Sequence, residues 1–69
     1  MNIKVGKWLE CTKAPELSPF YTVGNQYEVI EVGSGTCRLT DNISTHLWNT
    51  EVLAKTKELD HPIQFKLAK

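Results

Sequence analysis

The stretch that most constrains the fold is residues 21–48, YTVGNQYEVIEVGSGTCRLTDNISTHLW. Three short runs rich in β-branched and aromatic residues lie within it, at 27–32, 36–40 and 43–48. A Gly-Ser-Gly turn separates the first two runs, and Asp41-Asn42 separates the second pair. The stretch therefore predicts three antiparallel strands. In the last strand we expect alternate residues to face opposite ways, with an apolar face of Ile43, Thr45 and Leu47 and an opposite face of Ser44, His46 and Trp48.

The flanking segments predict two further strands and a short helix. Residues 3–12 alternate between apolar and polar side chains, and Gly6 within them predicts a bulge or a sharp bend. Residues 13–20 are expected to form a long loop, because its prolines lack amide donors and restrict their neighbours. In the turn that follows, Gly24 and Asn25 are the expected positive-φ positions. Residues 51–54 predict one helical turn with its cap at Asn49-Thr50-Glu51, and residues 63–68 predict the last strand.

Five short strands in 69 residues predict an all-β fold, a small five-stranded barrel with one short helical turn before the last strand. A flat sheet of this length would leave too much apolar surface in water. The chain is long enough for one domain, which we place at residues 1–69. Its core is expected to contain Val29, Leu39 and Phe65, contributed by different strands.

Composition and charge restrict the classes of function. Eight basic side chains balance eight acidic ones, and the balance also holds locally, so no basic block marks a phosphate-binding surface. No apolar run approaches the roughly 20 residues that span a bilayer, and the first ten residues do not resemble a signal peptide. We therefore expect a cytoplasmic protein without a membrane partner. Cys11 and Cys37 are expected to be reduced and buried.

No set of residues predicts catalysis, a metal or a cofactor. His46 and His61 are 15 positions apart and have no further ligands at metal spacing, so they are interpreted as surface histidines. Cys37 and His46 lie on adjacent predicted strands, but a nucleophilic pair would also need an orienting group, an oxyanion hole and a cleft. We predict that the protein is not an enzyme and binds no cofactor.

The aromatic side chains are the strongest indication of a binding surface. Six large rings are more than so small a core is expected to hold, and we assign Tyr27 and Phe65 to the interior. The predicted surface combines the proline-containing loop with the remaining rings and consists of Trp8, Pro15, Leu17, Pro19, Phe20, Tyr21 and Trp48. The alternative is that these rings cover a second small core beneath the long loop.

Part of the chain resembles a pattern found in small bacteriophage and prophage proteins. The segments that carry the resemblance are Phe20-Tyr21-Thr22-Val23-Gly24, Tyr27-Glu28-Val29-Ile30 and Leu39-Thr40-Asp41-Asn42. In those proteins "xTVGKxYEVI", a glycine turn and "xxDDxG" precede a strand and a short turn. The resemblance covers residues 20–53 and departs from the pattern at Asn42-Ile43, where a DG-type turn is usual. It implies an SH3-like barrel and a phage origin, and it implies no activity.

Three hypotheses about function follow. The leading one is a non-enzymatic binding module, a phage or prophage accessory protein that binds and modulates a host or phage protein in the host cytoplasm. The second is a nucleic-acid-binding barrel, in which Trp8, Tyr21 and Trp48 stack on bases while phosphates contact Lys4, Lys7, Lys13 and Arg38. The third is a homo-oligomeric structural component that associates through an unpaired edge strand.

Overall fold

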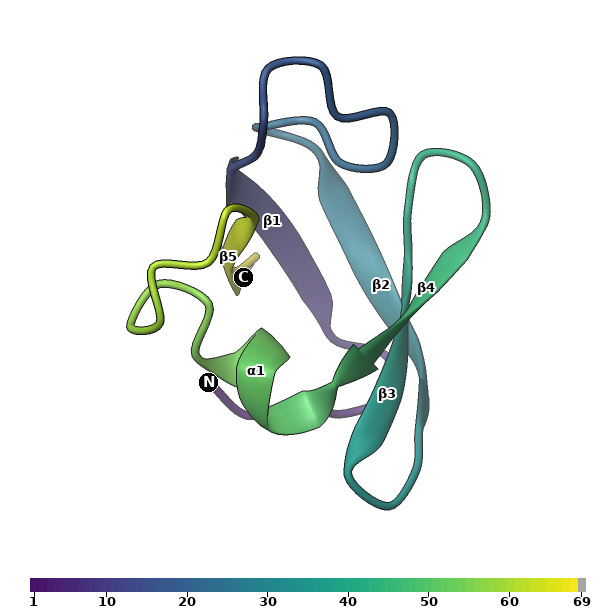
Figure 1. Cartoon of the computed structure of the whole chain (residues 1–69). Coiled ribbons are helices and arrows are strands. Elements are labelled where there is room, and N and C mark those ends of the chain that lie inside the picture. Colours follow the sequence, from purple (N-terminus) through teal and green to yellow (C-terminus); the bar gives the residue numbers. More distant parts are fainter. Residues whose placement is uncertain (69) are drawn as a thin grey trace.

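The computed structural model describes residues 1–68 and shows a small all-β domain. Its elements, in chain order, are β1 (Trp8–Lys13), β2 (Gln26–Val32), β3 (Thr36–Thr40), β4 (Thr45–Asn49), α1 (Thr50–Ala54) and β5 (Gln64–Leu67). The strands form one sheet in the order β4-β3-β2-β1-β5, and every neighbouring pair is antiparallel. The sheet curls into a half-barrel, with α1 across its lower opening (Figure 1). The predicted fold class is confirmed, including the helical turn before the last strand.

The first strand is shorter than the sequence predicts. Gly6 has a φ of 91°, and the Lys7 amide donates to the Lys4 carbonyl at 3.1 Å, so a tight turn precedes β1. Gly6 thus makes the predicted bend, and β1 begins only at Trp8. Gly24 also has the expected positive φ of 95°, whereas Asn25 does not, because one left-handed residue suffices for the turn.

The predicted faces of the fourth strand are wrong. Asp41 Oδ1 accepts hydrogen bonds from the amides of Ile43 and Ser44, so these two residues belong to a side-chain-capped turn and β4 begins at Thr45. Leu47 is 61% exposed, while the Trp48 side chain packs against the core. The alternation itself is present, but the large ring, with more surface to bury than Leu47, takes the inner face.

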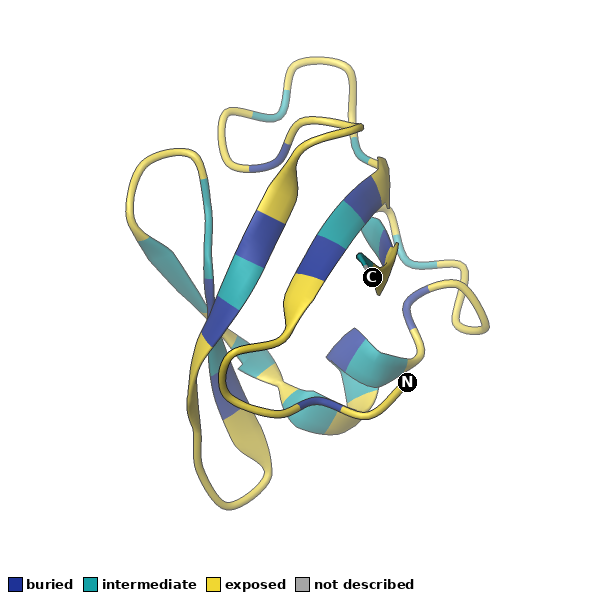
Figure 2. Ribbon diagram, turned by 180° about the vertical axis from the view of Figure 1, so that it is seen from behind, coloured by how far each residue is buried: buried dark blue, intermediate teal, exposed yellow. Residues whose placement is uncertain are grey.

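A single core fills the concave side of the half-barrel. Figure 2 shows buried and less buried residues alternating along β1, β2 and β3, as expected when one face of a sheet is covered. The hydrophobic members of the core are Ile3, Leu9, Cys11, Tyr21, Tyr27, Val29, Cys37, Leu39, Leu53 and Phe65. The assignments of Val29, Leu39 and Phe65 are confirmed, as is that of Tyr27.

Both cysteines are free and buried, as predicted. Burial raises the pKa of the Cys11 and Cys37 thiols above their ordinary value of 9.0. Neutral thiols in this setting behave as small apolar side chains.

The segment after β4 closes one end of the barrel. The Asn49 side chain caps α1 by accepting from the Val52 amide at 3.1 Å, and Leu53 is the buried residue of the helix. Farther along, the buried Thr56 hydroxyl accepts from the Phe65 amide at 3.1 Å. Among the residues that the structure describes, no helix has the length and apolar character needed to cross a membrane.

Candidate functional site

The predicted aromatic surface does not exist as one patch. Trp8 lies on the outer face of β1, whereas Tyr21 and Trp48 lie on the inner side of the barrel. Tyr21 is only 2% exposed, so its predicted exposure is wrong. Trp48 is half-buried and donates from Nε1 to the Tyr21 hydroxyl at 3.1 Å.

Tyr21 is buried because the β1–β2 loop folds back over the open side of the half-barrel. Its ring makes edge contacts with Tyr27 and Phe65, at centroid distances of 4.8 and 5.1 Å. Burial raises the pKa of Tyr21 to about 12, despite the opposing effect of the hydrogen bond from Trp48. Tyr21 therefore joins the main core, and within residues 1–68 the buried hydrophobic residues form one cluster with no separate core beneath the loop.

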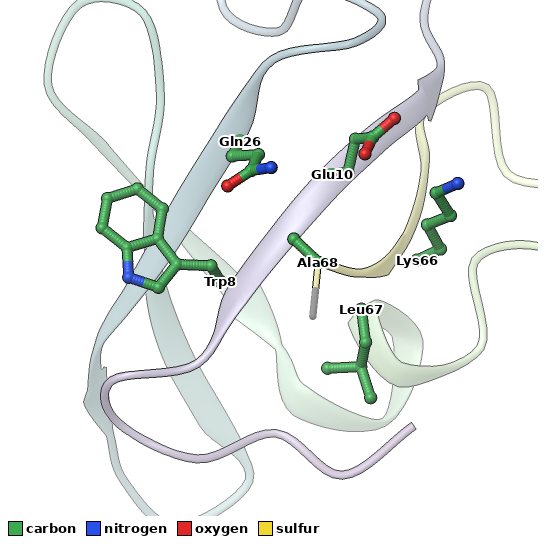
Figure 3. Close-up of a pocket in the computed structure, with 6 residues that line it drawn as sticks. All are labelled: Trp8, Glu10, Gln26, Lys66, Leu67 and Ala68. Atoms are coloured by element: carbon green, nitrogen blue, oxygen red, sulfur yellow. The ribbon is translucent and has the colours of Figure 1, made fainter.

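Trp8 borders a different feature, an open groove of about 630 Å³ across β1 and β5. Its lining residues are Trp8, Glu10, Gln26, Lys66, Leu67 and Ala68 (Figure 3). The indole of Trp8 and the ammonium group of Lys66 lie on opposite sides of β1 in this view. Because half of the lining side chains are polar or charged, the groove lacks the apolar lining typical of small-molecule sites.

The remaining predicted residues lie at one end of the barrel, where two loops meet. These are the β1–β2 loop, residues 14–25, and the β3–β4 turn, residues 41–44, both in the upper part of Figure 1. Asn42 joins them: its amide donates to the Phe20 carbonyl at 2.8 Å, and its Nδ2 donates to the Pro19 carbonyl at 3.3 Å. We call residues 14–25 and 41–44 together the loop platform.

Further hydrogen bonds tie Asn42 to the sheet. Its Nδ2 also donates to Thr22 Oγ1 at 3.0 Å, and its Oδ1 accepts from the Tyr27 hydroxyl at 2.8 Å. The same Tyr27 oxygen accepts from the Thr22 amide at 2.9 Å. A buried β2 side chain thus anchors both loops through a single asparagine, and the platform has a defined shape without a partner.

Asp41 and His46 support the platform from beneath. The Asp41 side chain is 2% exposed, and its Oδ2 is paired with His46 Nδ1. Burial acts to raise the pKa of Asp41, but hydrogen bonds from the Ser44 and Ile43 amides and from His46 outweigh it and hold the pKa below its ordinary 3.8. Phe20 packs edge-on against the His46 ring at 4.5 Å. The contact with His46 holds the Phe20 ring in place.

The histidines are thus half-buried parts of the packing and not surface residues as predicted. His61 packs near Trp48 at a centroid distance of 5.4 Å, and its Nδ1 accepts from the Ile63 amide. Within residues 1–68, no three His, Cys, Asp or Glu side chains gather closely enough to hold a metal ion. Cys37 pairs with Trp48 in the β3–β4 ladder and His46 pairs with Leu39, so thiol and imidazole lie on different rungs.

The platform exposes several apolar side chains. Leu17 is 92% exposed and Phe20 is 37% exposed, and both Pro15 and Pro19 are exposed beside them. Two exposed residues that the sequence analysis did not select, Val23 and Ile43, complete the set. The sequence Asp41-Asn42-Ile43-Ser44 could have predicted that Ile43 lies in an exposed turn, because Asp at the first position favours a side-chain-capped turn over a strand.

Two of the four cations considered for phosphate binding are paired with acidic side chains. Lys13 Nζ lies 3.5 Å from Asp60, and Arg38 Nε lies 3.2 Å from Glu31 on the outer face of the sheet. With Tyr21 buried and Trp8 on the opposite side of the sheet from Trp48, the three rings form no common stacking surface.

Comparison of the chain with protein-family models, curated proteins and solved structures finds no match. The function is therefore inferred from the geometry of the loop platform.

Proposed function

We propose that the protein is a non-enzymatic binding module whose loop platform binds another protein. The observation that carries the proposal is the platform itself, two loops joined through Asn42 that hold Leu17, Phe20 and Ile43 at the surface. Exposed apolar side chains that are gathered on one surface often mark a site of protein interaction. A preformed surface also favours binding, because it avoids the entropic cost of ordering loops on association.

The composition of the platform suits a protein partner. Its exposed side chains include those of Leu17, Phe20 and Ile43, and the exposed polar ones, apart from Glu16, are uncharged. Its only ionisable side chains are those of Glu16, Tyr21 and Asp41. One or two buried apolar anchors contribute about 2 kcal/mol or more each to a protein interface. Nucleic acid would find no cation on this surface to neutralise its phosphates. Phe20, fixed against His46, and Leu17, nearly fully exposed, are the proposed anchors.

The resemblance of residues 20–53 to small phage proteins extends the proposal to biological context. In this view the chain is an SH3-like phage or prophage accessory protein, and the platform binds and modulates a protein of the bacterial host or of the phage in the host cytoplasm. The proposal assigns no chemical step to the chain.

Capture from bacterial lysate tests the proposal, with three forms of the tagged chain and with nuclease present or absent. We expect the wild-type chain to retain a specific protein after nuclease treatment, and Leu17→Asp to lose it. Leu59→Asp is the matched control, because Leu59 is 56% exposed but lies outside the platform. Equal retention by wild type and Leu17→Asp, or loss of all retained protein on nuclease treatment, would overturn the proposal.

A further inference from the structure

The two edges of the half-barrel sheet are protected to very different degrees. Unpaired edge strands are sites of association, and proteins usually blunt them with charged side chains, proline or a capped backbone. The β5 edge has all three: Lys66 lies within the strand, Pro62 precedes it, and the Thr56 hydroxyl occupies the Phe65 amide. The β4 edge has no charged side chain and no proline, and only its Asn49 carbonyl is capped, by the first turn of α1.

The hydrogen-bond alternation shows which groups of β4 face outward. The Asp41 amide donates to the Ser44 carbonyl, and the Thr50 amide donates to the Gly35 carbonyl. Because hydrogen-bonded pairs alternate along an antiparallel ladder, the pairs 39/46 and 37/48 also exchange hydrogen bonds. The N–H and C=O groups of Thr45, Leu47 and Asn49 therefore point away from β3. The Asn49 carbonyl accepts the first hydrogen bond of α1, as expected of an N-cap residue. Within residues 1–68, the other outward-facing groups make no backbone hydrogen bond outside the β3–β4 ladder.

We propose that β4 is a self-association site at which a second copy of this chain adds its own β4 in antiparallel orientation. The two-fold axis passes through Leu47, so Leu47 pairs with Leu47 of the second copy and Thr45 pairs with its Asn49. In this register Leu47 exchanges both of its backbone hydrogen bonds with Leu47 of the second copy, and at each end the Asn49 amide donates to the Thr45 carbonyl. The result is a ten-stranded sheet with β5 at both ends.

Self-pairing is favoured by the sequence of the strand. The segment Thr-His-Leu-Trp-Asn contains no Lys, Arg, Asp or Glu, so the symmetric register places no such like charges opposite one another. It also covers Leu47, which is 61% exposed on the outer face, with the same side chain from the second copy. The interface is isologous, so it closes as a dimer and does not propagate into a fibre. It is a different surface from the loop platform.

Analytical ultracentrifugation of the full chain tests the proposal, at concentrations up to roughly 1 mM, the range of weak dissociation constants. We expect wild type to reach twice the 7.8 kDa monomer mass. Leu47→Lys is expected to remain monomeric, because it places two cations on the symmetry axis, whereas the control Leu59→Lys still dimerises. A monomeric wild-type chain at the highest concentration would overturn the proposal, as would a dimer that persists in Leu47→Lys.

A cysteine variant provides a second readout that does not rely on weakening the interface. In the proposed register the two copies of residue 47 form a hydrogen-bonded pair, whose Cα separation of about 5.5 Å suits a disulfide. Mild oxidation should therefore link Leu47→Cys into a covalent dimer while Leu59→Cys stays monomeric. The native thiols do not interfere, because Cys11 and Cys37 are buried. Equal crosslinking of the two variants would contradict the proposed register.

Discussion

Replacing Asn42 by alanine should uncouple the two loops of the platform. The substitution removes three side-chain hydrogen bonds, to Tyr27, Thr22 and the Pro19 carbonyl, and keeps the backbone bond to Phe20. A net contribution of about 0.5–1 kcal/mol for each partly exposed bond gives a loss of about 2 kcal/mol. That is a large part of the roughly 3–10 kcal/mol available to a chain of 69 residues. The melting temperature should fall by about 8–16 °C.

Thermal unfolding followed by circular dichroism measures this loss, and amide hydrogen exchange locates it. We expect exchange in Asn42→Ala to accelerate over residues 14–25 and 41–44 and to change little in β1 and β2. Asn25→Ala is the matched control, since Asn25 is exposed and its side chain makes no hydrogen bond within residues 1–68. A melting temperature for Asn42→Ala within error of that of Asn25→Ala would refute the argument that Asn42 joins the loops.

Three other predictions concern the core and the support of the platform. A thiol reagent should label Cys11 and Cys37 slowly in the native protein and label two equivalents after denaturation, because both thiols are buried with raised pKa values; rapid native labelling would disprove their burial. Phe65→Ala should cost about 3–5 kcal/mol, measured by urea unfolding, since Phe65 connects β5 to the buried aromatic rings; an unchanged midpoint would mean that β5 does not close the barrel. The lowered pKa of Asp41 adds stability that is present above the ordinary value of 3.8 and is lost as the pH falls through the folded-state pKa. The melting temperature of Asp41→Asn should therefore be below that of wild type near pH 7 and should approach it at low pH. A difference in melting temperature that stays constant across this pH range would contradict the assigned role of Asp41.

The strand pattern could be predicted from the sequence because its turns are encoded locally. The glycine turn at 33–35 and the proline-containing loop separate runs of β-forming residues, and β3 occupies residues 36–40 as predicted. Asn49 similarly marks the start of α1 through a side-chain cap. Features of this kind depend on a few neighbouring residues and need no knowledge of the tertiary structure.

The candidate site could be predicted only in part because it depends on long-range contacts. Pro15, Leu17, Pro19 and Phe20 lie on the exposed loop as expected, but Tyr21 beside them turns inward to meet Phe65, 44 positions away. No local pattern separates Phe20 from Tyr21. Likewise, Trp48 on the inner face donates a hydrogen bond to Tyr21, 27 positions away, and no local pattern indicates this contact.

Site-specific photocrosslinking in bacterial cells tests the central claim most directly, because it reports which surface touches which partner. A benzophenone amino acid would replace, one at a time, Leu17 and Ile43 on the platform, Leu47 on the β4 edge, Trp8 at the outer groove and Leu59 as the control; all five are exposed. We predict that positions 17 and 43 both crosslink to one partner protein other than this chain. Position 47 should crosslink to a second copy of the chain and give an adduct of twice the monomer mass. If a protein other than this chain crosslinked to position 8 or 59 and none crosslinked to positions 17 and 43, the assignment of the loop platform as the binding surface would be contradicted.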